Sequence, residues 1–471
     1  MNPQPSGELG RDENVLIIGL GRSGRASVEV LRTRVARVYA TDEASPDELA
    51  DAFADLAAAG VEYVEPARLG DYLERITVAV LSPGIPLTSP LVRRVQAARI
   101  PVFSEVEVAY RLCRAPIVAV TGTKGKSTTT ALLGALFEAA GKTVRVGGNI
   151  GNALIRETAA ASPDDWVIAE VSSFQLESIR SFKPRISLIL NITPDHLDRY
   201  PSMEEYAEAK FRIFANQGAG DTFIGNLDDP IVASANQGQD DGSRIKAREL
   251  WFASEPHRNT TLYLRNGRQI VYAPPTGDPR PVDILRTSEI ALLGAHNIEN
   301  VMGAILVALA AELPLDAIRA GVRNFRALGH RLEPVAEIDG VQYVDDSKAT
   351  NPGAVIAAMR SFDRPIVLIA GGKAKGTDFA AMGKVVSSRA KAVVLIGEAA
   401  DDIAAVVRRA KVEHATSMDD AVLRASNLAE PGDIVLLSPG CASFDMFRSA
   451  EHRGELFAGA VRGLGAVAGA R

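Results

Sequence analysis

The chain has 471 residues, of which 46% are hydrophobic and 23% charged, and this length and balance indicate about three globular domains. The formal net charge of −6 argues against a broad electrostatic surface for nucleic acid or anionic membranes, so phosphate must be bound at a local site. Two cysteines, Cys113 and Cys441, are too few for a disulfide framework. No uncharged apolar stretch reaches the roughly 20 residues of a membrane span, and the N-terminus lacks a signal-peptide core, so we expect a soluble cytoplasmic protein.

The first segment has the pattern of a small doubly wound α/β unit. We expect a strand, a glycine-rich turn, a helix and two more strands, at residues 15–18, 19–24, 26–31, 37–40 and 78–81. The turn carries Gly19, Gly21 and Gly24, and the second strand ends at Asp42, an order typical of dinucleotide-binding folds. A turn without Cβ atoms lets backbone N–H groups approach a pyrophosphate. The alternative is a tight turn without a ligand, and nothing downstream resembles the site of a nicotinamide-dependent dehydrogenase.

The second segment contains a phosphate-binding loop. An apolar strand at residues 116–120 runs into a Gly-x-x-Gly-Lys-Ser sequence, and a helix follows at residues 131–140. This spacing is shorter than the common P-loop, but the strand–loop–helix context is the same. Lys126 is expected to reach the β- and γ-phosphate oxygens, and the Ser127 hydroxyl can ligate Mg²⁺. A lysine-rich turn in solvent is the alternative.

Polar residues follow the next two strands of this segment. A strand at residues 166–169 ends at Glu170, which suits either a further Mg²⁺ contact or a helix cap. A strand at residues 186–190 leads into a polar cluster that includes Asp195 and His196, so chemistry is expected at this edge of the sheet. His196 could equally be an ordinary surface histidine.

Two helices and a hairpin complete this segment. We expect helices at residues 202–215 and 301–311 and an antiparallel hairpin at residues 261–272. Ser202 is the predicted cap of the first helix, and composition alone makes Lys210 an exposed helix lysine. Asn266 and Gly267 form the hairpin turn. Asn297 lies near the start of the second helix, either as a cap or as a ligand.

The third segment reads as another open α/β domain. Its four expected strands alternate with helices and lie at residues 342–344, 366–370, 392–396 and 434–437. Each strand ends in a polar or glycine-rich loop, which predicts a cleft at the strand ends. A glycine turn for a diphosphate, a P-loop and a third domain together suggest a ligase that activates a carboxylate with ATP as an acyl phosphate.

Several motifs resemble those of the Mur ligases and the related folylpolyglutamate synthetases, over nearly the whole chain. They lie at residues 122–128, 148–151, 170–177, 191–198, 209–213, 296–297, 330–331, 345–351 and 438–444. The motifs at residues 345–351 and 438–444 are similar to those of the family member that adds glutamate.

The resemblance implies three α/β domains. A Rossmann-like UDP-binding domain would span residues 1–104, a central P-loop ATPase-type domain residues 105–327, and a Rossmann-like domain that binds the amino acid and closes residues 328–471. It also implies an ATP-dependent amide ligase of peptidoglycan precursor synthesis. This monomeric ligase would add D-glutamate to UDP-N-acetylmuramoyl-L-alanine through an acyl phosphate.

The resemblance further implies roles for individual residues. The catalytic residues would be Lys126, His196 and Lys210, the last carbamylated by CO₂. Two Mg²⁺ ions would be held by Ser127, Glu170, His196 and the modified Lys210. ATP would contact Gly122, Thr123, Lys124, Gly125, Lys126, Ser127, Thr128, Asn297, Arg331 and Asp346. The UDP substrate would contact Gly21, Arg22, Ser23, Asp42, Ser82, Gly84 and Asn149. The incoming glutamate would contact Lys348, Thr350, Lys375, Ser443 and Phe444.

Three alternatives stay open at this point. A ligase of the same family could add L-glutamate, because mirror-image ligands use the same charged groups. A folylpolyglutamate-type ligase would need no diphosphate at the Gly19 turn. A nucleotide-sensing protein that binds NAD would not need the metal-binding residues Glu170, His196 and Lys210.

Overall fold

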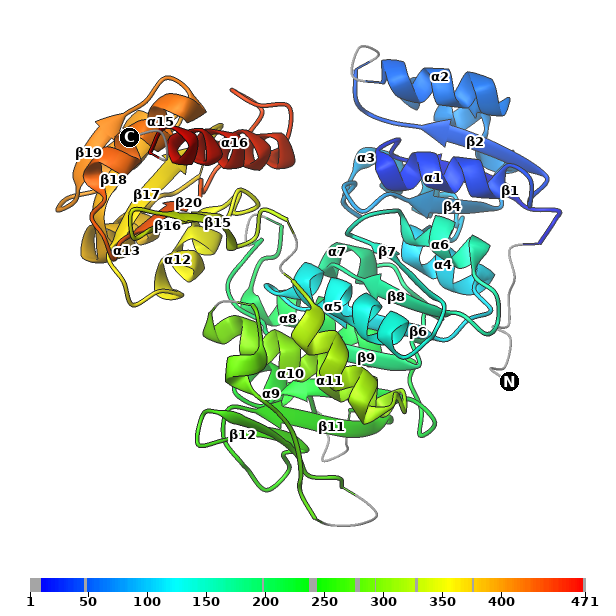
Figure 1. Cartoon of the computed structure of the whole chain (residues 1–471). Helices are drawn as coiled ribbons and strands as arrows, with labels where there is room; N and C mark the ends of the chain where they lie inside the picture. The colour runs from blue at the N-terminus through cyan, green and yellow to red at the C-terminus, as the bar shows by residue number, and fades with distance from the viewer. Residues whose placement is uncertain are drawn as a thin grey trace. The chain divides into compact units, whose positions relative to one another are not determined.

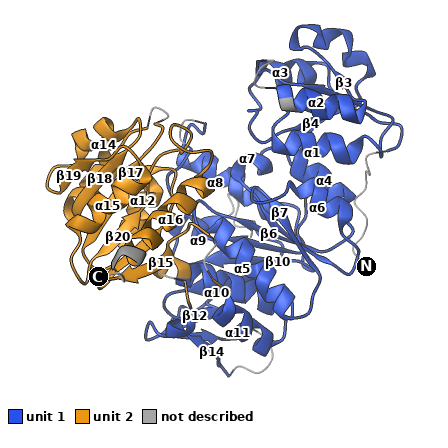
Figure 2. Cartoon of the chain, turned by 45° about the horizontal axis from the view of Figure 1, so that its top comes forward, with its two compact units in different colours: residues 1–290, 298–325 blue, residues 291–297, 326–471 orange. Residues whose placement is uncertain are grey.

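The computed structural model describes residues 10–45, 49–196, 199–236, 244–275, 280–292, 294–326, 329–374 and 377–468. The chain divides into two compact units (Figure 2). Unit 1 comprises Met1–Ile290 and Ile298–Phe325, and unit 2 comprises Ala291–Asn297 and Arg326–Arg471. Unit 1 therefore covers the first predicted domain and most of the second, of which residues 291–297 and 326–327 fall in unit 2, and the border between the first two domains remains a prediction. Among the described residues, no helix is both long and apolar enough to cross a membrane.

The first sheet of unit 1 is parallel throughout and has the strand order β3-β2-β1-β4-β5. Its strands are β1 (Asn14–Ile18), β2 (Arg37–Thr41), β3 (Glu62–Tyr63), β4 (Val78–Leu81) and β5 (Val102–Ser104). Its helices are α1 (Arg22–Leu31), α2 (Ala50–Ala59) and α3 (Pro90–Ala97). The strand order reverses beside β1, which is the place where open α/β sheets bind ligands. The predicted strands are confirmed, whereas α1 begins earlier than predicted, directly after Gly21.

The second sheet of unit 1 has nine strands in the order β14-β13-β12-β11-β10-β9-β6-β8-β7. Figure 1 labels β6, β7, β8, β9, β11 and β12 of this sheet. The strands are β6 (Ile117–Thr121), β7 (Val144–Gly148), β8 (Trp166–Glu170), β9 (Ile186–Ile189), β10 (Thr222–Asn226), β11 (Arg248–Ala253), β12 (Leu262–Arg265), β13 (Gln269–Tyr272) and β14 (Val282–Arg286). The helices are α4 (Glu105–Leu112), α5 (Lys126–Ala139), α6 (Leu154–Ala160), α7 (Ser173–Leu176), α8 (Met203–Phe211), α9 (Pro230–Ala233), α10 (Ala295–Ala310) and α11 (Leu315–Asn324).

The middle of this sheet is parallel and its far edge is antiparallel. Strands β6, β8 and β9 are buried along their length except at Trp166, as expected for a parallel sheet covered on both faces. The predicted hairpin is confirmed: β12 pairs with β13 in an antiparallel register that places Arg265 opposite Gln269. Asn266 and Gly267 between them both have positive φ, of 54° and 65°, as a type I′ turn requires.

Unit 2 holds a six-stranded sheet of order β15-β16-β20-β17-β18-β19. Its strands are β15 (Glu333–Ile338), β16 (Val341–Asp345), β17 (Ile366–Gly371), β18 (Ala390–Ile396), β19 (Lys411–His414) and β20 (Ile434–Leu437). Its helices are α12 (Pro352–Arg360), α13 (Ala380–Arg389), α14 (Ala400–Val406), α15 (Met418–Leu428) and α16 (Ala450–Ala468). The four predicted strands form the parallel interior, and helix α16 lies against β15 and β16. The edge strands β15 and β19 were not predicted.

Candidate active site

The predicted phosphate-binding loop connects β6 to α5. Gly125 has a φ of 83° and immediately precedes the helix, so Lys126 and Ser127 lie in the first turn of α5. The helix therefore begins five residues before the predicted start. The Lys126 ammonium donates to the carbonyl oxygens of Gly122 and Thr123, both at 2.9 Å, which folds its side chain back over the loop. This is the arrangement of backbone amides and a lysine that cradles phosphates.

The loop that follows β9 holds the phosphate-binding loop in place. The side-chain oxygen of Asn191 accepts the backbone N–H of Lys124 at 2.9 Å, and its amide nitrogen donates to the Lys124 carbonyl at 3.1 Å. The Thr123 hydroxyl accepts the backbone N–H of Thr193 at 3.0 Å. The loop is thus shaped by hydrogen bonds within the protein itself.

Glu170 lies at the end of β8, where it is 1% exposed. On the adjacent strand β6 it is paired with Val120, close to the point where this strand enters the phosphate-binding loop. Its Oε1 atom accepts a hydrogen bond of 2.8 Å from the side chain of Asn149. Its Oε2 atom is buried and accepts no hydrogen bond from the described residues. A buried carboxylate oxygen without a partner fits a site for a divalent cation.

Lys210 is buried in α8 and is only 2% exposed, so the expectation of an exposed helix lysine is wrong. Its ammonium donates to the Gly122 carbonyl at 2.9 Å and lies 4.5 Å from the centre of the Tyr206 ring. Burial, together with the positive charge of Lys126, lowers the pKa of Lys210 well below its usual value, while Asp195 opposes this effect. The structure therefore brings Lys126 and Lys210 to the same glycine carbonyl.

His196 also lies beside Tyr206. The two ring centres are 6.1 Å apart, and the Tyr206 hydroxyl lies 3.2 Å from that of Thr123 in the phosphate-binding loop. His196 has a φ of 55°, and its ring lies 3.8 Å from Asp195 and packs on Phe174. Tyr206 connects His196, Lys210 and the loop, and sequence reasoning missed it because only the fold brings these residues together.

The predicted metal ligands do not form a ready-made cluster of histidines and carboxylates. Among the described residues, three such side chains offer atoms within 4.8 Å of one another only in unit 2, at His330, Glu333 and Asp345. There, the His330 ring and an Asp345 oxygen are 2.7 Å apart, and Glu333 accepts the His330 backbone N–H. These oxygens already have partners, so this cluster is an internal hydrogen-bond network.

The predicted UDP-binding residues line one pocket of about 270 Å³ in unit 1. All seven take part: Gly21, Arg22, Ser23, Asp42, Ser82, Gly84 and Asn149. Asp42 is buried, and its two oxygens accept the backbone N–H groups of Leu20 at 2.5 Å and Ala44 at 2.9 Å, which braces the glycine turn. Because Asn149 also bonds to Glu170, the inner end of this pocket adjoins the edge of the nine-stranded sheet.

Arg22 lines this pocket and contacts the loop after β7. Its guanidinium donates to the carbonyl of Gly151 at 2.7 Å and to those of Asn149 and Gly148 at 3.2 and 3.3 Å. Gly148 itself has a φ of 111°, and a Cβ atom there would lie 2.3 Å from the Glu170 carbonyl. The start of α1 is thereby joined to the loop after β7.

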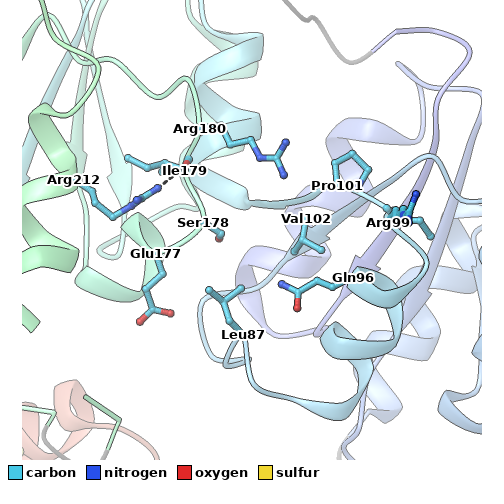
Figure 3. A pocket seen from close by; sticks show the side chains of 11 residues that line it. Leu87, Gln96, Arg99, Pro101, Val102, Glu177, Ser178, Ile179, Arg180 and Arg212 are labelled. Atoms are coloured by element: carbon cyan, nitrogen blue, oxygen red, sulfur yellow. Dashed lines mark hydrogen bonds between the residues drawn. The ribbon is translucent and has the colours of Figure 1, made fainter. Parts of the chain in front are cut away.

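A second hollow of about 550 Å³ lies elsewhere in unit 1 (Figure 3). It is lined by Leu87, Gln96, Arg99, Ile100, Pro101, Val102, Glu177, Ser178, Ile179, Arg180 and Arg212. Arg212 is fixed there by hydrogen bonds to the carbonyls of Leu176 and Ile179, and Glu177 is paired with Arg199. The predicted site residues do not line this larger hollow.

Asp346, which is predicted to contact ATP, lies in unit 2 at the carboxyl end of β16. Asp346 is 8% exposed, and its Oδ2 atom accepts the Ser438 hydroxyl at 2.9 Å. Burial raises the pKa of Asp346 to about 7, although the bond from Ser438 and the charge of Arg331 act in the other direction. The predicted ligand Asn297 also belongs to unit 2 and is buried in the first turn of α10.

Four of the five predicted glutamate-binding residues lie on two loops at the same end of this sheet. Lys348 forms an ion pair with Glu451 of α16, and Thr350 follows it on the loop after β16. Ser443 is buried and Phe444 is 67% exposed, on the loop after β20. The two loops are joined by a hydrogen bond of 2.8 Å from the Gly440 N–H to the Ala349 carbonyl. Lys375 lies outside the described residues.

Comparison with known proteins accounts for this arrangement. Family models match residues 13–104 as "Mur ligase MurD-like, N-terminal domain", residues 120–308 as "Mur ligase middle domain" and residues 330–441 as "Mur ligase, glutamate ligase domain". UDP-N-acetylmuramoylalanine–D-glutamate ligase of Pelotomaculum thermopropionicum is 45% identical over 94% of this chain and 96% of its own length. The protein of that name from Koribacter versatilis is 41% identical over 96% and 98%.

Solved structures share the fold at low identity. UDP-N-acetylmuramate-alanine ligase of Thermotoga maritima superposes with a TM-score of 0.58 at 16% identity, covering 96% of this chain and 99% of its own. A pseudomurein peptide ligase of Methanothermus fervidus gives a TM-score of 0.57 at 16% identity, covering 96% and 100%. The match of three successive domain models and of full-length relatives leads to one conclusion: this chain belongs to the Mur ligase family.

Proposed function

We propose that this chain joins D-glutamate to UDP-N-acetylmuramoyl-L-alanine and cleaves ATP to ADP and phosphate. The relatives at 45% and 41% identity carry the name of this activity and match nearly the full chain. One contact carries the proposal in this molecule: the 2.8 Å hydrogen bond from Asn149 to Glu170. It links the pocket that suits a UDP-linked substrate to the strand beside the phosphate-binding loop.

The reaction needs two steps, activation of the carboxylate and attack by the amine. An oxygen of the alanyl carboxylate attacks the γ-phosphorus of ATP, the bond between this phosphorus and ADP breaks, and an acyl phosphate forms. The deprotonated amine of D-glutamate then attacks the acyl carbon, the bond from this carbon to the phosphate oxygen breaks, inorganic phosphate and one proton of the nitrogen leave, and the amide remains. Since both steps bring anions together, the protein must supply positive charge and must exclude water that would hydrolyse the acyl phosphate.

The phosphate-binding loop would supply the first part of this charge. Backbone N–H groups at the start of α5 point toward the loop, and the helix dipole favours an anion there. In the described state the Lys126 ammonium is bound to two carbonyls of the loop. It would exchange these contacts for the phosphate oxygens of ATP, within the reach of its own side chain.

Mg²⁺ would supply the rest of the charge when bound, by neutralising the γ-phosphate and the substrate carboxylate. The unpartnered Oε2 atom of Glu170 fits such an ion, and the Ser127 hydroxyl lies in the first turn of the neighbouring helix. His196 and a carbamylated Lys210 would hold a second ion. These four residues would thus serve both the nucleotide and the acceptor.

Lys210 is suited to carbamylation by its surroundings. Carbamylation joins the carbon of CO₂ to a neutral amine, which then loses a proton and becomes an anion. Burial and the charge of Lys126 favour the neutral amine in Lys210. The modification would convert a cation near a metal site into a ligand for the metal.

The test is phosphate release from ATP in the presence of UDP-N-acetylmuramoyl-L-alanine, with D-glutamate and L-glutamate added in parallel. Release with D-glutamate only is the expected result. Release with L-glutamate only would keep the chemistry and refute the stereochemistry. If folded protein released phosphate neither with D-glutamate nor with L-glutamate, the proposal would be refuted. The Lys210→Ala variant serves as the inactive reference, and partial recovery with short carboxylic acids would support the carbamate.

A further inference from the structure

Arg453, in the first turn of α16, is fully buried in unit 2. Its Nε atom donates to the Ser347 hydroxyl at 2.9 Å, and its Nη2 atom donates to the Ser347 carbonyl at 2.8 Å. Its Nη1 atom donates to the Cys441 carbonyl at 3.1 Å. One guanidinium therefore spans the loop after β16 and the loop after β20.

A third loop lies against the same side chain. A Cβ atom added to Gly372, which follows β17, would lie 3.3 Å from the Nη1 atom of Arg453 and 2.3 Å from the Ala442 carbonyl. The backbone of the next residue, Lys373, donates to that Ala442 carbonyl at 2.8 Å. Three loops at the carboxyl ends of neighbouring strands thus meet around one arginine.

The positive charge of Arg453 is not cancelled by direct contact with a carboxylate. Within the described part of the chain, the hydrogen bonds of its guanidinium go to one hydroxyl and two carbonyls, and it takes part in no ion pair. Burial lowers the pKa of Arg453 to about 10, although the charges of Asp445 and Asp345 act in the other direction, so the group stays charged at neutral pH. These two carboxylates offset the cost of burying the charge only in part, and an anion bound nearby would offset more of it.

We propose that Arg453 is a positioning residue for the acidic amino acid that this ligase consumes. Ser347 directly precedes Lys348, and Cys441 lies two residues before Ser443, so the fork of Arg453 sets the spacing of the two loops that carry these groups. Its charge beneath the loops would also favour a dicarboxylic amino acid over a neutral one. This inference rests on the proposed function and concerns its amino-acid site.

The test compares Arg453→Lys with a matched arginine at the opposite end of the same sheet. Lysine keeps the charge but cannot form the fork. Arg364 likewise donates to backbone carbonyls, those of Gly432 at 2.5 Å and Asp433 at 3.1 Å, between the amino ends of the strands. Arg364→Lys therefore controls for the general loss of an arginine brace.

We expect Arg453→Lys to raise the KM for D-glutamate roughly tenfold, with the KM values for ATP and UDP-N-acetylmuramoyl-L-alanine within about twofold of wild type. Arg364→Lys should leave all three KM values unchanged. The inference would be overturned if Arg453→Lys raised all three KM values equally. It would also be overturned if the KM for D-glutamate in Arg453→Lys matched that in the Arg364→Lys control.

Two further measurements keep the test decisive. If Arg453→Lys does not fold, Ser347→Ala removes one of the three hydrogen bonds and keeps the charge. A KM for D-glutamate about threefold above wild type is then expected, and no change overturns the inference. The wild-type chain is assayed first with D- and L-glutamate. If neither releases phosphate, the proposed function fails and this inference falls with it, whereas normal wild-type turnover makes the variants a test of Arg453 alone.

Discussion

Replacing Glu107 should destabilise unit 1 strongly, because this fully buried side chain holds a whole turn of backbone. Its Oε2 atom accepts the backbone N–H groups of Arg180 and Phe182 at 2.9 Å, and both of its oxygens lie 3.0 Å from the Ser181 nitrogen. Its Oε1 atom also accepts the Nε–H of Arg111 at 2.8 Å. Glu107→Ala would remove the acceptor of three backbone N–H groups and the carboxylate that pairs with Arg111.

The contacts allow the size of the effect to be worked out. An unsatisfied buried donor costs about 1–3 kcal/mol, and breaking a buried ion pair costs about 3–5 kcal/mol, with overlap between the two. We expect Glu107→Ala to lower the free energy of unfolding by about 4–6 kcal/mol. Glu107→Gln can keep the three backbone contacts through its carbonyl oxygen and lose only the pairing with Arg111, so about 2 kcal/mol is expected.

The assay is guanidinium unfolding followed by tryptophan fluorescence. The chain has two tryptophans, Trp166 in β8 and Trp251 in β11, and both report on unit 1. The control is Glu208→Ala, which removes a carboxylate that is 56% exposed and paired with Arg244, where a loss below about 1 kcal/mol is expected. A Glu107→Ala variant no less stable than this control would refute the reasoning, as would Glu107→Gln and Glu107→Ala of equal stability.

Three further predictions concern activity. Carbamylation requires a neutral amine, and burial lowers the pKa of Lys210, so kcat should fall as the pH drops through that pKa. Added bicarbonate should restore kcat. A pH profile that is insensitive to bicarbonate would contradict the carbamate. Gly125→Ala should weaken ATP binding at least about 100-fold, since φ is 83° and the new Cβ would lie 2.1 Å from the Asn300 side-chain oxygen. Calorimetry would measure the Kd, and a value within threefold of wild type would show that the loop adapts. Asp346, whose pKa burial raises to about 7, is ionised only at higher pH, so the KM for ATP should fall between pH 6 and 8 in the wild type and stay flat in Asp346→Asn.

The sequence predicted the parts of the fold whose signals are local. Buried strands appear as continuous apolar runs, and the glycines beside them mark the turns. The edge strands of unit 2 carry no such signal: β15 and β19 are partly exposed along their length and mix charged with apolar residues. The start of α5 was placed too late because the polar residues after Gly125 read as a loop, although they form the first turn of the helix.

The site was predicted where motifs fall at strand ends, and missed where only tertiary structure joins the residues. The seven pocket residues of unit 1 come from four different segments, yet each sits in a recognisable turn or after a strand. Arg453 gave no signal, because an arginine in an amphipathic helix is normally exposed and its burial depends on the loops above it. Lys210 shows the same limit, since its helix has almost no apolar face from which burial could be inferred.

The hydrogen bond between Asn149 and Glu170 also has a thermodynamic consequence. A ligand that engages Asn149 from the pocket changes the environment of Glu170, and a ligand on Glu170 changes that of Asn149. Coupling of this kind is reciprocal: the factor by which one ligand alters the affinity of the other is the same in both directions. The total binding free energy is the same whichever ligand binds first, as for any pair of ligands, and the shared hydrogen bond would set the size of the coupling between them.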